Sequence, residues 1–168
     1  VSCKLSESGV GVIQGAYEGK MREANEGAEA GIKKMGKSEY LNIGVPLRMI
    51  DKELARSSKI NLPAAETIGD RKKALIEFCD ACIVMPSGGF GTILESLETF
   101  HKNQLDEKFG GKIRPLIFFG KRWKKIYDVL YKNLNMNKQK GGESFCHFGD
   151  DLKDWEIILL ELKSKEER

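Results

Sequence analysis

The sequence has 168 residues, of which 40% are hydrophobic and 32% are charged, and its formal net charge is +3 at pH 7. This length and composition predict one globular domain, residues 1–168, with a core of its own. Acidic and basic residues are interleaved, which argues against nucleic acid as a partner. No apolar run approaches the roughly 18–20 residues of a membrane span, so no membrane association is expected. No targeting segment is visible, which favours the cytoplasm; organellar targeting stays open because the N-terminus looks incomplete.

A first strand–glycine–helix unit lies near the N-terminus. Val10 to Ile13 predict a strand, Gly15 and Gly19 follow it, and a helix is expected from Lys20 to Ala30 with Met21 on its buried face. Glycines between a strand and a helix can bring backbone amides close to a ligand. They also occur wherever a tight turn needs a positive φ, and both interpretations stay open here.

The next segment leads to a basic helix start. Residues 41–45 predict a strand, and residues 47–65 predict a loop with about one helical turn, placed as a substrate-facing lid. A helix is expected from Asp70 to Phe78. Arg71 and Lys72 lie near its N-terminus, where cations oppose the helix dipole by a few tenths of a kcal/mol. An anionic ligand would remove this conflict, whereas a solvated basic surface is the alternative.

The chain is organised around the segment that follows. Residues 81–85 predict a buried strand, three glycines (Gly88, Gly89 and Gly91) come next, and Thr92 opens a helix that is expected to reach Asn103. This order directs backbone N–H groups and the positive helix end at one point, which suits phosphate or carboxylate. Glu95 is expected in the first helical turn. Its carboxylate could act on a bound phosphosugar or simply stabilise the helix end.

Further elements alternate along the rest of the chain: strands at 113–119 and 145–148, and helices at 123–134 and 152–162. Ile126, Val129, Leu130 and Leu134 are expected on the buried face of the first of these helices. Helices that alternate with short apolar strands indicate an α/β fold with a mostly parallel sheet covered on both faces.

The cysteine pattern does not indicate a metal site. Cys79 and Cys82 have a CxxC spacing, but zinc requires a second ligand pair, and Cys146 with His147 lacks the spacing of one. We expect buried thiols and no metal.

Taken together, these residues resemble the LOG-like family, once labelled as lysine decarboxylases. Its signature is Pro-Gly-Gly-x-Gly-Thr-x-x-Glu after an Arg-Lys pair; the counterparts here are Arg71, Lys72, Gly88, Gly89, Gly91, Thr92 and Glu95. The resemblance extends over almost the whole chain. It implies a Rossmann-like three-layer fold and a homodimer that cleaves the N-glycosidic bond of nucleoside 5'-monophosphates (cytokinin ribotides or AMP-like), giving free base and ribose 5-phosphate without a cofactor.

The same resemblance implies roles for individual residues. Arg71 and Glu95 correspond to the catalytic pair. Substrate and phosphate are expected at Gly15, Gly19, Met21, Lys72, Gly88, Gly89, Gly91 and Thr92.

Three departures from the family pattern keep alternatives open. Ser87 is inserted before the glycines, residues 14–19 stand where relatives carry three consecutive glycines, and the first strand and helix of the fold are expected to be missing. The alternative function is a nucleotide- or phosphate-binding protein without turnover. A structural dimer, with the glycines serving only turn geometry, is the third possibility.

Overall fold

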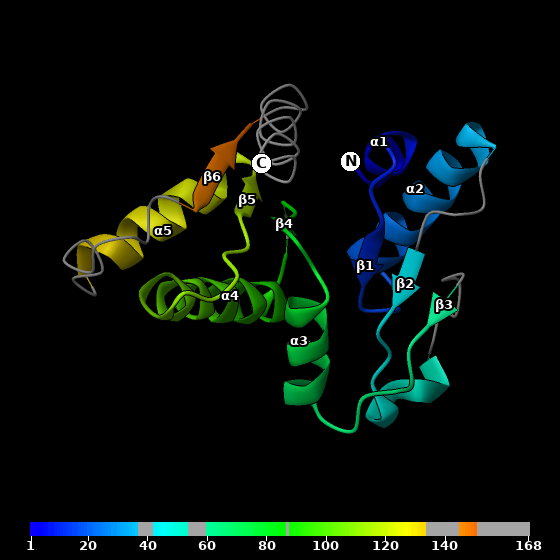
Figure 1. The fold of residues 1–168 in the computed structure, drawn as a ribbon, viewed down its shortest axis with the longest axis horizontal. Coiled ribbons are helices and arrows are strands. Elements are labelled where there is room, and N and C mark those ends of the chain that lie inside the picture. The colour runs from blue at the N-terminus through cyan, green and yellow to red at the C-terminus, as the bar shows by residue number, and fades with distance from the viewer. Residues whose placement is uncertain (37–41, 54–59, 87, 134–144, 151–168) are drawn as a thin grey trace. The chain divides into compact units, whose positions relative to one another are not determined.

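The structure is a computed structural model that describes residues 1–36, 42–53, 60–86, 88–133 and 145–150 (Figure 1). Within these residues the chain forms helices and two parallel sheets, so the predicted α/β, Rossmann-like fold class is confirmed. The chain divides into two compact units, residues Val1–Cys79 and Asp80–Arg168, and each is described by itself. That residues 1–168 form a single domain stays a prediction.

The first unit contains a parallel sheet with β2 at its centre. Its elements in chain order are α1 (Ser2–Glu7), β1 (Val12–Gln14), α2 (Lys20–Met35), β2 (Asn42–Gly44), the 3-10 helix η1 (Arg48–Glu53), β3 (Ile60–Asn61) and α3 (Ile68–Glu77). Ile43 of β2 pairs with Ile13 of β1 on one side and with Ile60 of β3 on the other. Because all three strands are parallel, their carboxyl ends meet at one edge of the sheet.

A short helix, α1, lies before the first predicted strand, in a segment for which the sequence predicted no helix. It packs against α2 (Figure 1), and Ser6 is completely buried there. Gly31 of α2 permits this contact, because a Cβ at that position would overlap the carbonyl oxygen of Cys3. A helix of this length is marginal by itself. Packing on α2, which local periodicity does not record, therefore explains the difference.

The segment between residues 47 and 65 was predicted as a loop with about one helical turn; the helical turn is present, and a strand that was not predicted follows it. It includes η1 and a short parallel strand, β3, and Leu47 forms a parallel bridge with Ala65. Residues 54–59 lie outside the described residues. Since β3 spans only two residues, its sequence is too short to show an alternating pattern.

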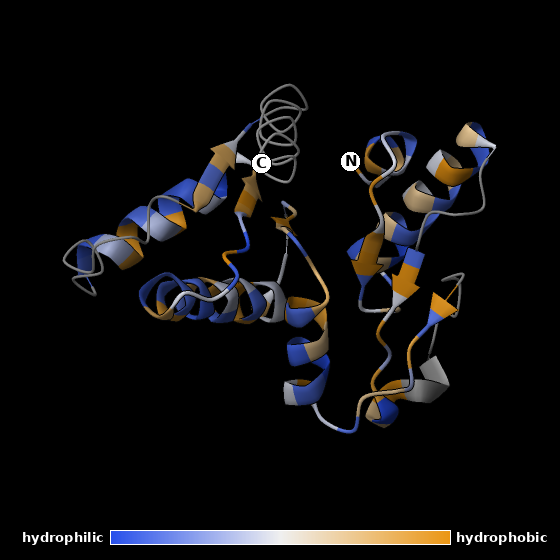
Figure 2. Ribbon diagram, in the orientation of Figure 1, coloured by the Kyte–Doolittle hydropathy of each residue, from blue (hydrophilic) through white to orange (hydrophobic). Residues whose placement is uncertain are grey.

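The second unit contains another parallel sheet, with β5 at its centre. Its elements are β4 (Cys82–Val84), α4 (Phe90–Phe109), β5 (Leu116–Phe119), α5 (Lys121–Asn133) and β6 (Cys146–Gly149). Strands β4 and β5 consist of apolar residues alone (Figure 2). The core cluster consists of Val84, Phe100, Leu116, Phe118, Trp123, Tyr127, Tyr131 and Phe145. Ile117 points to the opposite face of β5 and is 1% exposed, so both faces of this strand are covered.

Helix α5 buries a different face from the one predicted. Ile126 and Val129 are 38% and 59% exposed and Leu130 is half-buried, whereas Trp123 and Tyr127 are almost completely buried. Leu134 lies outside the described residues. The polar ends of these aromatic side chains have partners: Trp123 Nε1 donates to the carbonyl of Met85 (3.0 Å), and the Tyr127 hydroxyl donates to Ser96 Oγ (3.2 Å). Large rings with satisfied polar atoms bury more area than the aliphatic face would.

Several expectations concern features other than the core. The four cysteines are half-buried and form no disulfide, and the described residues contain no group of three or more side chains suited to a metal ion. None of the helices in the described ranges is both long and apolar enough to cross a membrane. The helix predicted at 152–162 lies outside the described residues.

Candidate functional site

Arg71 is held at the carboxyl ends of two neighbouring strands. Its Nε donates to the carbonyl of Val45 and its Nη2 to the carbonyl of Gly15, both at 3.0 Å. Gly15 follows β1 and Val45 follows β2. Nη2 also lies 3.2 Å from Sδ of Met21. The structure therefore brings together three of the predicted site residues, at the sheet edge where α/β proteins bind ligands.

The positive charge of Arg71 has no ionic partner in the described part of the chain. No carboxylate there lies within ion-pairing distance of the half-buried guanidinium. Its hydrogen bonds go to neutral peptide carbonyls, which fix its orientation but leave its charge uncompensated. Such a group is suited to bind an anion.

The N-terminus of α3 is compensated from within the chain, which corrects the predicted electrostatic conflict. Thr67 and Asp70 form a capping box: the Asp70 N–H donates to Thr67 Oγ1 (3.0 Å), and the Thr67 N–H donates to the Asp70 carboxylate (3.2 Å). The helix begins at Ile68, two residues before the predicted start. Arg71 and half-buried Lys72 therefore need no anion to offset their charges at this helix end. A ligand is indicated instead by the contacts of the Arg71 guanidinium, which leave its charge uncompensated.

Gly15 and Gly19 of the first glycine loop are required for different structural reasons. Gly19 is the N-cap of α2 with φ of 71°, a conformation that disfavours other residues. Gly15 instead lies against Arg71, with no room for a Cβ. Of the two open interpretations, positive φ explains Gly19 and close approach explains Gly15.

The second glycine turn leads into α4, as predicted, although the helix starts two residues earlier, at Phe90. Gly89 is its N-cap and supplies no capping side chain, and the first turn contains no acidic residue. A Cβ on Gly88 would come within 2.6 Å of the Thr92 side chain, whereas the space around the Cβ positions of Gly89 and Gly91 is open. The first N–H groups of α4 are thus presented without a capping side chain of their own, in contrast to those of α3. Ser87 lies outside the described residues.

Glu95 lies in the second turn of α4, not in the first. Because α4 begins at Phe90, Glu95 is its sixth residue, and the dipole effect falls off within the first turn. Stabilisation of the helix end is therefore a weaker explanation for this half-buried carboxylate. Arg71 belongs to the first unit and Glu95 to the second, so their pairing stays a prediction.

Two contacts of Arg71 were missed by sequence reasoning. The ring of Tyr17 lies under the guanidinium, with Cζ 5.0 Å from the ring centroid, and the carbonyl of Val45 accepts from Nε. A tyrosine inside a glycine loop after a strand was the available signal. The backbone carbonyl had none, since any residue supplies one.

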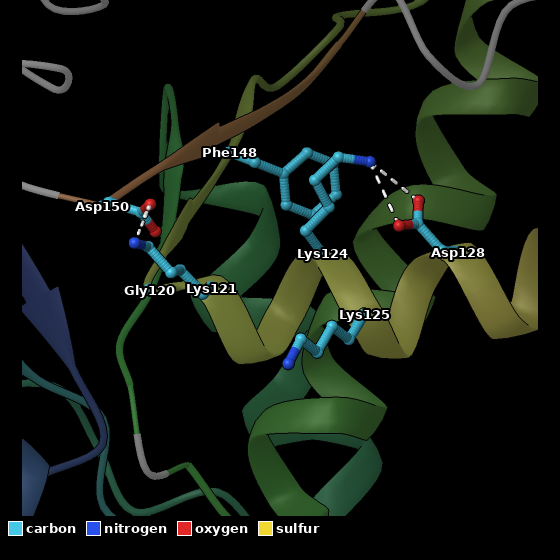
Figure 3. Close-up of a pocket in the computed structure, with 7 residues that line it drawn as sticks. All are labelled: Gly120, Lys121, Lys124, Lys125, Asp128, Phe148 and Asp150. Atoms are coloured by element: carbon cyan, nitrogen blue, oxygen red, sulfur yellow. Dashed lines mark hydrogen bonds and ion pairs between the residues drawn. The ribbon is translucent and has the colours of Figure 1, made fainter.

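A pocket of about 300 Å³ opens on the second unit, beside the start of α5 (Figure 3). Its lining residues are Gly120, Lys121, Lys124, Lys125, Asp128, Phe148 and Asp150, and none of the predicted site residues is among them. Lys124 pairs with Asp128 at 2.9 Å and Lys121 with Asp150 at 3.5 Å, which offsets two of the three lysine charges. The pocket is therefore a weak candidate for an anion site.

Comparison with known protein families matches residues 21–148 to a family described as "Possible lysine decarboxylase". No curated protein matches the chain. The matched range contains Arg71, Lys72, the second glycine turn and Glu95. The chain therefore belongs to the possible lysine decarboxylase family, which is the LOG-like family that its motifs resemble.

Proposed function

We propose that this protein hydrolyses the N-glycosidic bond of a nucleoside 5'-monophosphate, a cytokinin ribotide or an AMP-like nucleotide, to free base and ribose 5-phosphate. The proposal combines the family membership with the residue roles that the motif resemblance implies. It names Arg71 and Glu95 as the catalytic pair. Schiff-base decarboxylation needs one lysine set apart in a defined pocket. The pocket beside α5 instead presents three lysines together, two of them in ion pairs, so the family's description is not adopted as the activity.

The observation that carries the proposal is the state of Arg71. Its guanidinium is fixed by two strand-end carbonyls and has no carboxylate partner within the described ranges. The two N–H donors of Nη1 make no hydrogen bond within the described ranges and suit the oxygens of ribose or phosphate, and the fixed orientation reduces the entropy that is lost on binding.

The N-terminus of α4 is the proposed phosphate site. The helix is preceded by Gly88 and Gly89, and Gly91 and Thr92 lie in its first turn. Because the N-cap residue is a glycine, it has no side chain to accept hydrogen bonds from the first N–H groups. Hydrogen bonds from backbone N–H groups and the positive helix end both favour a dianionic phosphate. Lys72, Gly19 and Met21 are proposed as further substrate contacts.

Glu95 supplies the proposed electrostatic part of the reaction. When the bond from C1' to the base nitrogen breaks, its electron pair leaves with the base and positive charge develops on the ribose ring. A carboxylate next to that charge stabilises the transition state or orients the attacking water. Water then forms the new C1'–O bond, and its proton balances the charge on the departing base. The residues in these roles require no cofactor.

The test is incubation with AMP and, separately, with isopentenyladenosine 5'-monophosphate, with chromatography of the free base and ribose 5-phosphate. We expect Glu95→Gln to lower kcat by about 100-fold or more, in the range found when one transition-state stabiliser is removed. Arg71→Lys is expected to reduce kcat/KM strongly, because it keeps the charge and removes the planar fork. Glu98→Gln on the same helix and Lys73→Ala beside Arg71 are the matched controls, and both should retain activity.

Binding without turnover is the second candidate function. It is favoured by two departures from the family pattern, the altered first glycine loop at residues 14–19 and the inserted Ser87. Calorimetry with AMP separates the two: binding with no release of base supports this candidate. Release that survives Glu95→Gln would instead remove Glu95 from the mechanism.

We also propose that the protein is a homodimer. Helix α4 carries four apolar side chains that are largely exposed, Phe90, Leu94, Leu105 and Phe109. A partner copy could bury such side chains. Light scattering coupled to size-exclusion chromatography measures the mass directly, and a mass near 18.9 kDa, that of one chain, would refute the dimer.

A further inference from the structure

Tyr17 is turned inward by a strained backbone. Ala16, the residue before it, has φ of 63° although it is not glycine, and its N–H is bonded to the side chain of Gln14. Ala16 is 2% exposed. Strain of this kind, of order 1–3 kcal/mol, persists only where the surrounding structure enforces it, and it is concentrated at functional sites.

The hydroxyl of Tyr17 is fixed at two points. It donates to the carbonyl of Leu47 (2.8 Å) and accepts from the N–H of the same residue (2.6 Å). Leu47 is itself bridged to Ala65, two residues before Thr67, the N-cap of the helix that carries Arg71. The ring and the start of α3 are therefore tied to one backbone segment.

The guanidinium of Arg71 lies over the face of the Tyr17 ring. Cζ lies 5.0 Å from the ring centroid, within the distance of a cation–π interaction, and the ring is buried. Gly15 and Val45 accept hydrogen bonds in the guanidinium plane, and Met21 Sδ contacts Nη2. The hydrogen bonds fix the direction of the guanidinium, and the ring packs against it as a further support.

We propose that Tyr17 is a positioning residue that holds the guanidinium of Arg71 in place for the substrate. This inference rests on the proposed function for its effect on catalysis, but the contact itself can be measured separately. A tyrosine at this position supplies an aromatic surface that a glycine loop lacks. The loop of residues 14–19 therefore supports the arginine with a side chain, Tyr17, as well as with the carbonyl of Gly15.

Two variants separate the ring from its hydroxyl. Tyr17→Leu keeps an apolar side chain and removes the aromatic face; it should lower kcat for AMP about tenfold, the size expected for a desolvated cation–π contact. Tyr17→Phe keeps the ring and removes the anchor on Leu47, so an intermediate loss is expected. In the Arg71→Lys background, Tyr17→Leu should add no more than about a twofold loss, because the group it positions is already changed.

The second readout does not depend on activity. NMR follows the exchange of the Arg71 Hε proton with water, with its signal identified by its absence in Arg71→Lys. Tyr17→Leu should accelerate this exchange about tenfold, and Tyr17→Phe less, since the Nε–H bond to Val45 opens more often when the ring is lost. A merely structural tyrosine would lower the melting temperature and leave the exchange of this one proton, relative to neighbouring amides, unchanged.

Each outcome of these measurements supports or refutes the hydrolase proposal or the positioning role of Tyr17. If the wild type releases no base but its Hε exchange depends on Tyr17, the hydrolase proposal fails and the positioning contact stands. If the wild type is active and Tyr17→Leu changes neither kcat nor Hε exchange, the positioning role is refuted. If Tyr17→Leu does not fold, the same two readouts on Tyr17→Phe decide: wild-type values for both would refute it.

Discussion

At Gly15 the backbone lies so close to Arg71 that a Cβ would overlap Nη2 and come within 2.5 Å of Met21 Sδ. The carbonyl of the same residue accepts the Nη2 hydrogen bond. The obstructing atoms lie near the ends of flexible side chains, so they can move when the backbone cannot. A methyl group here would therefore displace the arginine and leave the sheet intact.

Gly15→Ala is expected to lower kcat/KM for AMP nearly as much as Arg71→Ala does and to lower the free energy of unfolding by a similar amount, because both variants remove the same contacts of Arg71 and neither shifts the backbone. Gly69→Ala on α3 is the matched control: its Cβ would lie 3.5 Å from Thr67 Oγ1, an ordinary contact. Kinetics and thermal unfolding of the three variants check this. Full activity of Gly15→Ala would show that the position of Arg71 is unimportant for turnover.

The sequence predicts this site better than it predicts the geometry around it. Glycine after a strand and an Arg-Lys pair are local patterns, and the structure brings Gly15, Met21 and Arg71 together. The support from Tyr17 depends on residues 30 and 54 positions away, Leu47 and Arg71, and no local pattern reports such distances. Whether Arg71 and Glu95 act as a pair stays a prediction.

Among the elements, the second strand–glycine–helix unit was the easiest to predict, because β4 is apolar, Pro86 closely follows its end and the glycines come next. The misses have physical reasons. The α4 start was placed at Thr92 because Phe90 and Gly91 carry no helical pattern, although a first turn needs none. The aliphatic face of α5 was chosen by hydropathy alone, whereas hydrogen bonds of the aromatic residues decided burial.

The contact between α1 and α2 includes an ion pair that responds to pH. Lys34 Nζ lies 2.7 Å from the Glu7 carboxylate, Lys4 lies 3.4 Å from it, and Cys3 Sγ lies 3.4 Å from it. The hydrogen bond from Lys34, followed by that from Cys3, lowers the pKa of Glu7 from 4.5 to about 2. A carboxylate whose pKa is lowered on folding stabilises the native state above its unfolded pKa.

We therefore expect the stabilisation by Glu7 to be complete above about pH 4.5 and to be lost progressively as the pH falls toward 2. Urea unfolding midpoints of the wild type and Glu7→Gln should differ at pH 7 and converge at low pH. Lys34→Met completes a double-mutant cycle, in which the coupling should disappear over the same interval. A difference between wild type and Glu7→Gln that is the same at pH 7 and pH 2.5 would assign the effect to packing.

At the scale of the whole molecule, both units present predicted site residues after the carboxyl ends of parallel strands. In the first unit Gly15 and Val45 follow β1 and β2, and in the second the turn at Gly88 and Gly89 follows β4. In sheets of this class ligands bind at that edge. Each of the two parallel sheets therefore has a glycine after a strand end. The proposed phosphate site, at the start of α4, can be tested by comparing a substrate that carries the phosphate with one that lacks it.

AMP should be cleaved at least about 100-fold more efficiently than adenosine, because several charge-assisted hydrogen bonds to phosphate contribute about 1.5–3 kcal/mol each and 1.4 kcal/mol corresponds to tenfold.

Gly91→Asp tests whether the first turn of α4 provides those bonds. Its Cβ position is open and the acid suits the helix dipole, so the variant should fold at least as stably as the wild type. Its carboxylate should nonetheless repel phosphate, raise KM for AMP and shrink the preference over adenosine. Gly91→Asn has the same shape without the charge and should retain most of that preference. If adenosine and AMP are cleaved equally well, or if Gly91→Asp and Gly91→Asn behave alike, the phosphate does not bind at α4, and Arg71 alone would have to account for any recognition of the anion.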